Sequence, residues 1–209
     1  GRGNVLTRQM FIQNMTSEIN PMDSIPFIGV DTGVGNNICV GNKYGLFYYE
    51  KTNDYELLRK LLKRWPNAIC VIDQGGDIIG PRKLREEFPN RVYLCFFGVD
   101  RKNDEIIRWN DDDGTVIADR TKIIQLVVDE YSEKRCPVYG TEGDWLEFWI
   151  EWSGMYRTTE DNALGVTVSK WNKPASGRAD YPFAQCYMRI AMDRFAEESS
   201  QFLEPRGND

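Results

Sequence analysis

Short apolar runs separated by glycine-containing turns occupy the first part of the chain. Three of them lie at residues 27–31, 38–40 and 46–49, and the segments between them contain Thr-Gly-Val-Gly-Asn and Gly-Asn-Lys-Tyr-Gly. Runs of this length joined by tight turns favour antiparallel pairing, so we expect a three-stranded meander. The first strand is expected to end at Asp31, with residues 32–36 forming a loop.

The pattern then becomes helical. Four apolar residues at helical spacing share one face, and the pattern stops before Pro66. These four are Leu58, Leu61, Leu62 and Trp65. Asn53 and Glu56 have the spacing of a capping box, which indicates that the helix begins between them. A helix with one apolar face should pack on the sheet.

Two more strands follow, separated by a short helix. A buried strand is expected at residues 68–73, ending in Asp73, and another at residues 92–97, while Pro81 is typical of the first turn of the helix between them. Strands that alternate with helices pair in parallel. The predicted fold class is therefore α/β: a mixed sheet of three antiparallel strands followed by two parallel strands, flanked by helices.

A hairpin and a further helix are predicted next. Residues 106–109 and 115–118 bracket the acidic, glycine-containing turn 110–114, which is typical of a hairpin and lacks the spaced ligands of a calcium loop. Asp119 is expected to cap the following helix. The apolar face of this helix carries Ile123, Ile124, Val127, Val128 and Tyr131.

The last third of the chain contains one clear element. Residues 136–174 are rich in Trp and Gly but show weak periodicity, so the sequence assigns no element to them. A final helix is expected to follow Asp180, because apolar residues recur there on one face. They are Phe183, Ala184, Tyr187, Ile190 and Ala191.

These patterns divide the chain into three parts. Residues 1–26 mix polar residues with one short apolar run and two prolines, which is typical of a linker or docking arm. Residues 27–198 form the predicted folded domain, and residues 199–209 a charged tail. No stretch is long and apolar enough to span a bilayer, so we expect a soluble protein without a membrane partner.

The composition excludes several kinds of chemistry. The 209 residues include no histidine, which rules out the usual serine and cysteine triads and histidine-based zinc sites. The five cysteines are odd in number and scattered, so they are expected to be buried thiols in a reducing cytosol. A net charge of -6 provides no general attraction to a polyanion, so any DNA contact must be local.

Carboxylates remain as the candidates for catalysis. Asp31 ends the first predicted strand, Asp73 ends the fourth, and Asp180 begins the last helix. If the first and fourth strands are neighbours, the two strand-end acids lie at one edge of the sheet, where a helix could add the third. Three carboxylates without histidine are the ligands that Mg²⁺ or Mn²⁺ prefers, which points to phosphodiester hydrolysis with two ions.

The three acidic motifs resemble those of the nuclease domain of viral large terminases, as found in tailed phages and herpesviruses. Here they read Phe-Ile-Gly-Val-Asp31-Thr-Gly, Ile-Cys-Val-Ile-Asp73-Gln-Gly-Gly and Gly-Arg-Ala-Asp180-Tyr-Pro-Phe-Ala. The resemblance covers roughly residues 27–195. It implies an RNase H-like fold of the RuvC-like superfamily, with these aspartates as ligands of the catalytic ions.

The resemblance also implies partners. In such terminases the nuclease domain follows an ATPase motor, and residues 7–16 are similar to the segment that leads out of it. The chain itself has no Walker A sequence. Double-stranded DNA, the motor domain of the same protein, the small terminase and the portal are the expected partners, in the cytoplasm of the infected host cell.

One feature departs from the family. Many members have two adjacent acids at the last motif, where this chain has Ala179 beside Asp180. The alternative ligands for a second ion are Asp77 and Asp119, although each is better explained as a cap or a solvated loop acid.

Basic residues near the acids are candidates for phosphate contacts. Lys170, Lys173 and Arg178 precede Asp180 and could meet the DNA backbone without reading its sequence. In the resembling family a hairpin in the region of residues 106–118 lies near the active site. That gives a weaker candidate set, namely Arg101, Lys102 and Arg108.

The sequence therefore predicts a metal-dependent endonuclease that cuts concatemeric viral DNA during packaging. Two alternatives stay open. One is another nuclease of the same fold, similar to a Holliday-junction resolvase or a transposase. The other is a catalytically idle DNA-docking module whose acids serve as caps.

Overall fold

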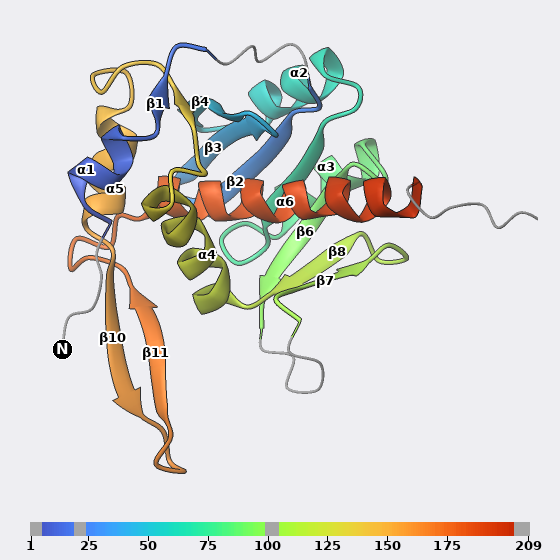
Figure 1. Cartoon of the computed structure of the whole chain (residues 1–209). Coiled ribbons are helices and arrows are strands. Elements are labelled where there is room, and N and C mark those ends of the chain that lie inside the picture. Colours follow the sequence, from blue (N-terminus) through green and yellow to red (C-terminus); the bar gives the residue numbers. More distant parts are fainter. Residues whose placement is uncertain (1–5, 19–23, 99–104, 203–209) are drawn as a thin grey trace, which may run out of the picture.

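The structure is a computed structural model that describes residues 6–18, 24–98 and 105–202, with side chains up to residue 194. A nine-stranded mixed sheet forms its centre, in the order β1-β9-β4-β3-β2-β5-β6-β8-β7. Figure 1 shows helix α6 lying across one face of this sheet, with helices α2 and α3 on the opposite side.

The five strands predicted from the sequence form the middle of the sheet. They are β2 (Phe27–Gly33), β3 (Gly35–Asn42), β4 (Gly45–Thr52), β5 (Ile69–Asp73) and β6 (Val92–Phe97). Strands β2, β3 and β4 pair antiparallel, whereas β5 pairs in parallel with both β2 and β6. The predicted mixed sheet of three antiparallel and two parallel strands is confirmed.

Short strands extend the sheet on both sides. Strand β8 (Thr115–Ala118) pairs in parallel with β6, and β7 (Ile107–Asn110) completes the predicted hairpin. On the other side, β9 (Val138–Tyr139) pairs in parallel with β4 and with β1 (Met15–Thr16). The sequence predicted the hairpin. It did not predict the parallel pairing of β8 with β6, because this pairing joins strands that are not consecutive in the chain.

Each face of the sheet has its own core. The helices concerned are α2 (Glu56–Arg64), α3 (Ile79–Glu87) and α6 (Asp180–Phe202). Because side chains alternate along a strand, Ile28 and Val30 of β2 join the core under α2 and α3, whereas Phe27 joins the core on the α6 side. All five cysteines are buried and free, as predicted.

Helix α6 crosses β2 at close range because Gly29 has no side chain. A methyl group built on Gly29 would overlap the backbone of Ala184 and of Met188. The small Ala184 is itself fully buried. This approach brings the first turn of α6 over the end of β2.

The N-terminal arm docks on this body. Its helix α1 (Arg8–Ile12) buries Phe11, whose ring centroid lies 5.5 Å from that of Tyr131 and 5.4 Å from that of Trp149. Leu6 is buried too. Residues 6–16 are therefore part of the folded unit, and the motor domain expected before them stays a prediction.

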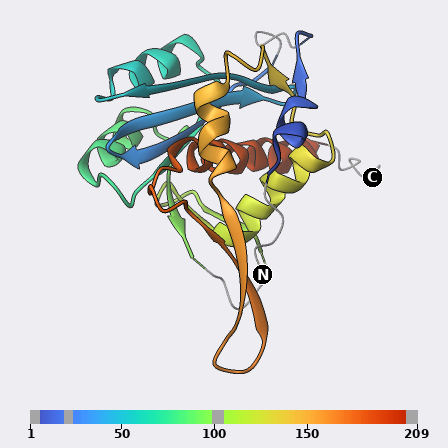
Figure 2. The same cartoon turned by 90° about the vertical axis from the view of Figure 1, so that its left-hand side faces the viewer.

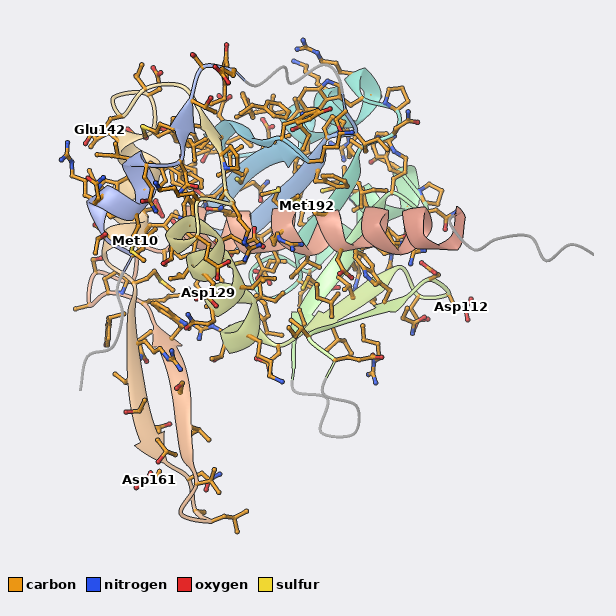
Figure 3. The ribbon with its side chains drawn as sticks, in the orientation of Figure 1. Met10, Asp112, Asp129, Glu142, Asp161 and Met192 are labelled. Atoms are coloured by element: carbon orange, nitrogen blue, oxygen red, sulfur yellow. The ribbon has the colours of Figure 1, made fainter. Side chains whose placement is uncertain are left out.

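The unassigned region contains one helix and a ribbon. Helix α5 (Leu146–Ser153) follows β9, and then β10 (Tyr156–Asp161) and β11 (Thr167–Asn172) form a separate two-stranded antiparallel sheet. The ribbon projects from the body in Figures 1 and 2, and Figure 3 labels Asp161 well out along it. Its exposed tip explains the weak hydrophobic pattern, since few of its residues face a core.

Two local predictions were wrong. Asp31 does not end its strand and residues 32–36 are not a loop, because β2 and β3 continue to Gly33 and Gly35 and turn tightly between them. Helix α2 has no capping box: its N-cap is Tyr55, and it is Asp54 Oδ1 that accepts a bond from the backbone N–H of Glu56 (2.9 Å).

The remaining helix predictions are confirmed. Asp119 caps α4 (Arg120–Ser132) by accepting a bond from the N–H of Lys122 (3.0 Å). Helix α6 begins at Asp180 and runs into the segment 199–209 that was predicted as a tail. Within the part of the chain that the structure describes, no helix is both long and apolar enough to cross a bilayer.

Gly29→Ala tests the contact between β2 and α6. The new methyl group meets backbone atoms that cannot rotate away, so we expect a loss of about 3 kcal/mol or more in the free energy of unfolding. Gly33→Ala is the matched control in the same strand, because nothing lies within 4 Å of a methyl group there. Urea unfolding of both variants measures the difference, and an equal stability would contradict the close approach.

Candidate metal centre

Asp31 of β2 and Asp73, the last residue of β5, lie side by side. The parallel register pairs Val30 with Ile72, so the two aspartates are the next residues in each strand. Strand alternation puts Asp31 on the same face as Gly29, under α6. This register explains why the two acids are close to each other, as the sequence predicted.

Asp180 is the first residue of α6, and α5 holds that end of the helix. Glu151 Oε1 accepts a hydrogen bond from the backbone N–H of Tyr181 (3.0 Å), which satisfies one of the free donors of the first turn. Ala179 is fully buried. A carboxylate at that position would therefore be buried as well.

The charges of the three aspartates are coupled. Asp31 is only 9% exposed, and its pKa rises from the ordinary 3.8 to about 8. Burial is the largest cause, followed by repulsion from Asp73 and then from Asp180, which also shares a hydrogen bond with Asp31. Lys173 partly offsets the rise. The structure thus places Asp73, Asp180 and Lys173 close enough to Asp31 for their charges to act on it.

Asp73 is held in place by its own loop. The Gly75 N–H donates to Asp73 Oδ1 (2.8 Å), and the Thr32 hydroxyl lies 3.3 Å from Oδ2. A side chain at Gly76 would overlap Thr32, so the two glycines after Asp73 let this loop fold onto the end of β2. The sequence Asp-Gln-Gly-Gly therefore fixes the carboxylate locally.

The donor set suits a hard divalent cation. Oxygen ligands from one buried and two partly exposed carboxylates fit Mg²⁺ or Mn²⁺, and a cation would take the place of the proton that Asp31 carries. Among the described residues, no three His, Cys, Asp or Glu side chains form a ready-made metal-binding group. The carboxylates would have to draw closer around an ion, with water completing its coordination.

The two alternative acids have other partners. Asp77 Oδ2 accepts from the Tyr55 hydroxyl (2.7 Å), and its Oδ1 accepts from the Ile79 N–H (3.0 Å). The Tyr55 hydrogen bond is the largest cause that lowers the pKa of Asp77. Asp119 is the cap of α4. Both acids therefore have structural roles.

The predicted basic residues differ in position. The Nζ of Lys173 lies 4.8 Å from the ring centroid of Phe183, and its charge lowers the pKa of Asp31. Arg178 is exposed and lines the cleft beside Asp180, whereas Lys170 is exposed on β11. Trp171, between the two lysines, is fully buried and hence cannot stack on a base.

The weaker set of basic residues belongs to the other hairpin. Arg108 is exposed on β7, whereas Arg101 and Lys102 lie outside the described residues. Figure 3 labels Asp112 in the turn of this hairpin, at the outer end of β7 and β8. The acidic segment is therefore a hairpin turn, as predicted.

A cleft of about 400 Å³ opens beside Asp180. Its lining includes Asn37 of β3, Lys51 of β4, Glu151 of α5 and Pro174. The sequence analysis missed Asn37 and Glu151. Glu151 lies in the region without periodicity, and Asn37 is a polar residue whose burial appears only when the strands are paired.

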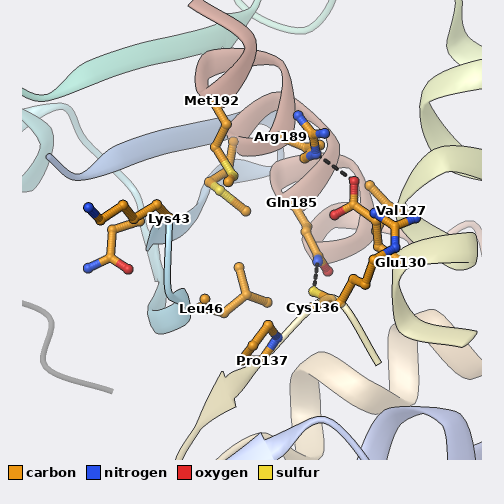
Figure 4. A pocket seen from close by; sticks show the side chains of 13 residues that line it. Lys43, Leu46, Val127, Glu130, Cys136, Pro137, Gln185, Arg189 and Met192 are labelled. Carbon is orange, nitrogen blue, oxygen red and sulfur yellow. Dashed lines mark hydrogen bonds and ion pairs between the residues drawn. The ribbon is translucent and has the colours of Figure 1, made fainter. Parts of the chain in front are cut away.

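A second hollow lies at the opposite end of the meander, around the turn from β3 to β4. Figure 4 shows Lys43, Leu46 and Met192 around it, with the ion pair between Arg189 and Glu130 (2.7 Å) at its side. Its volume of about 40 Å³ holds a few water molecules and no substrate. The cleft beside Asp180 is therefore the better candidate for a ligand site.

Comparison with known proteins identifies the fold. Neither a protein-family model nor a curated protein matches the sequence. Among solved structures, the nuclease domain of the large terminase subunit of bacterial virus Sf6 matches with a TM-score of 0.59 and 9% identity, over 90% of this chain and 98% of that one. A variant of that domain with manganese gives the same TM-score and identity, over 90% and 99%.

The large terminase nuclease of the thermophilic phage G20c matches with a TM-score of 0.50 and 15% identity, over 86% of this chain and 93% of that one. The chain thus has an RNase H-like α/β fold. More narrowly, it is the version of that fold seen in large terminase nuclease domains, as the acidic motifs had suggested.

The raised pKa of Asp31 predicts how stability depends on pH without metal. Between pH 4 and 8 Asp31 is protonated in the folded protein and ionised in the unfolded chain, so unfolding releases a proton and stability falls as pH rises. The expected slope reaches about 1.4 kcal/mol per pH unit. In Asp31→Asn this contribution disappears. Urea unfolding in EDTA at several pH values measures both proteins, and parallel curves would exclude the coupling.

Proposed function

We propose that this chain is a metal-dependent endonuclease, the nuclease domain of a viral DNA-packaging motor that cuts concatemeric double-stranded DNA. The observation that carries the proposal is the electrostatic coupling of buried Asp31 to both Asp73 and Asp180 at one edge of the sheet. The terminase nuclease domains that share the fold support it.

In this proposal the three aspartates hold two Mg²⁺ or Mn²⁺ ions. Such ions activate a water molecule and stabilise the leaving 3′ oxygen of a phosphodiester. The chain's own part is to hold the carboxylates: the Gly75 N–H orients Asp73, and the fixed first turn of α6 orients Asp180. The manganese of the Sf6 variant domain supports a divalent cation as the cofactor.

Phosphate contacts by Lys170, Lys173 and Arg178 belong to the same proposal. Lys173 has the strongest support because its charge already acts on Asp31. Arg178 is supported by its place in the cleft. Lys170 has only its exposure on β11 in its favour.

The partners and location follow from the same role. Double-stranded DNA is the substrate, an ATPase motor domain of the same protein moves it, and the small terminase and portal complete the machine in the cytoplasm of the infected host cell. A resolvase-like or transposase-like nuclease would use the same acids on another DNA structure. A panel of linear, branched and supercoiled DNA separates these activities.

A catalytically idle DNA-docking module is the second candidate. The lack of a ready-made metal-binding group among the described residues favours it. In that case the acids would not bind a cation, and their mutual repulsion would only reduce stability. Activity and cation binding therefore decide between the two functions.

The first test is cleavage of supercoiled plasmid. Mn²⁺ or Mg²⁺ should support conversion to nicked and linear DNA, whereas EDTA should abolish it. Asp73→Asn should slow cleavage by several orders of magnitude because a ligand loses its charge while keeping its volume. Asp119→Asn is the matched control: it makes the same chemical change at a helix cap, where Asn also caps well, and should retain full activity.

Cleavage that persists in EDTA would refute the metal mechanism. Equal activity of Asp73→Asn and Asp119→Asn would remove Asp73 from the site.

The second test is thermal melting with and without Mn²⁺. Millimolar Mn²⁺ should raise the melting temperature of the wild type, since an ion that binds only the folded state stabilises it. Asp180→Asn should melt a few degrees higher than the wild type in EDTA, because repulsion is relieved, and should respond less to Mn²⁺. An equal Mn²⁺ response in both proteins would favour the idle module.

A further inference from the structure

Four side chains form a row across the sheet under the start of α6. Asp31 pairs with Asn37 of β3, and Asn37 pairs with Lys51 of β4. Paired residues of adjacent strands point to the same face, so Asn37 and Lys51 continue the line that Asp73 and Asp31 begin. The row thus runs from two acids through an amide to an ammonium group.

Asn37 is an unusual member of this row. Its side chain is only 2% exposed, yet its Nδ2 group has no hydrogen-bond partner in the described part of the molecule. Buried donors are nearly always paired. The neighbouring Asn36 follows this rule, because its Nδ2 donates to the carbonyl oxygen of Asp54 (3.1 Å). Asn37 also belongs to the lining of the cleft beside Asp180, so the open donor lies next to a space that a ligand could enter.

The cleft combines hydrogen-bond donors and cations with acids. Asn37, Lys51 and Arg178 line it together with Asp180, Glu147 and Glu151, so its donors and cations lie beside one of the proposed metal ligands. The carboxylate of Glu151 accepts a hydrogen bond from the Tyr181 N–H and also interacts with the charge of Lys51. Adjacent strands are about 5 Å apart, so Asn37 lies one strand spacing from Asp31, and Lys51 lies about 10 Å from it.

We propose that Asn37 and Lys51 bind the phosphate backbone of the DNA strand next to the scissile bond. Asn37 Nδ2 donates to a non-bridging phosphate oxygen, and Lys51 Nζ neutralises the following phosphate at the rim of the cleft. These contacts fix the strand's path into the row of acids without reading its sequence. The inference rests on the proposed nuclease function and names the residues that position its substrate.

Asn37→Leu tests the amide. Leucine keeps a similar volume and removes a donor that has no protein partner, so the melting temperature should stay within a few degrees of the wild type. The kcat/KM for plasmid cleavage with Mn²⁺ should fall about tenfold or more, as expected for one lost hydrogen bond to a charged group. The Mn²⁺-induced rise in melting temperature should be unchanged, because the metal ligands remain.

Lys51→Ala tests the proposed contact between Lys51 and a phosphate, and Lys43→Ala is its control. Both lysines belong to the β3–β4 meander, but Lys43 lies at the opposite end, beside the small hollow of Figure 4. In Lys51→Ala the salt dependence of binding to a short DNA duplex should weaken by about one unit of slope. Lys43→Ala should match the wild type. Because Lys51 is exposed, this variant also carries the test if Asn37→Leu does not fold.

The outcomes separate the two proposals. If the wild type cleaves no DNA with Mn²⁺, the nuclease function itself fails. If the wild type cleaves DNA and both Asn37→Leu and Lys51→Ala behave like it, the nuclease function stands and only the proposed phosphate contacts of Asn37 and Lys51 are overturned. A weakening of the salt dependence in Lys43→Ala as large as in Lys51→Ala would also overturn them.

Discussion

The close contact between α6 and β2 is the constraint on which the site depends. Gly29 lets the backbone of the helix lie almost directly on the strand, so the first turn of α6 reaches the end of β2. Asp180 comes from a segment about 150 residues beyond Asp31 in sequence, and this contact is what joins them. The hydrogen bond from the Tyr181 N–H to Glu151 then fixes the helix end from the other side. Packing, rather than local sequence, places the third carboxylate.

That packing has an electrostatic cost. Burying Asp31 between two other carboxylates raises its pKa to about 8, so the metal-free protein keeps a proton where a cation would fit better. Lys173 relieves the repulsion only in part. A cluster of carboxylates of this kind reduces the free energy of unfolding, as is usual where like charges gather in a folded protein.

The sequence predicted those features that depend on short-range rules. The strand pattern and the acids at strand ends led to Asp31 and Asp73, because the parallel register follows from strand–helix alternation. The helix cap at Asp119 was equally local. By contrast, Glu151 and Asn37 could not be predicted. Glu151 lies on a short helix without a clear apolar stripe, and the burial of Asn37 depends on its pairing with Asp31 and Lys51. The positions of both residues in the site depend on tertiary contacts.

The row across the sheet resolves an apparent conflict in the composition. A chain with a net charge of -6 offers little general attraction to DNA, and its proposed catalytic residues add further negative charge. Along the row, however, charge changes within a few strand spacings from Asp73 and Asp31 to the neutral donor of Asn37 and the cation of Lys51. In the proposed function, a phosphate backbone that approaches the acids would meet these donors and this positive charge on one side. The order of residues along the strands, and not the overall charge, is therefore what the proposal depends on.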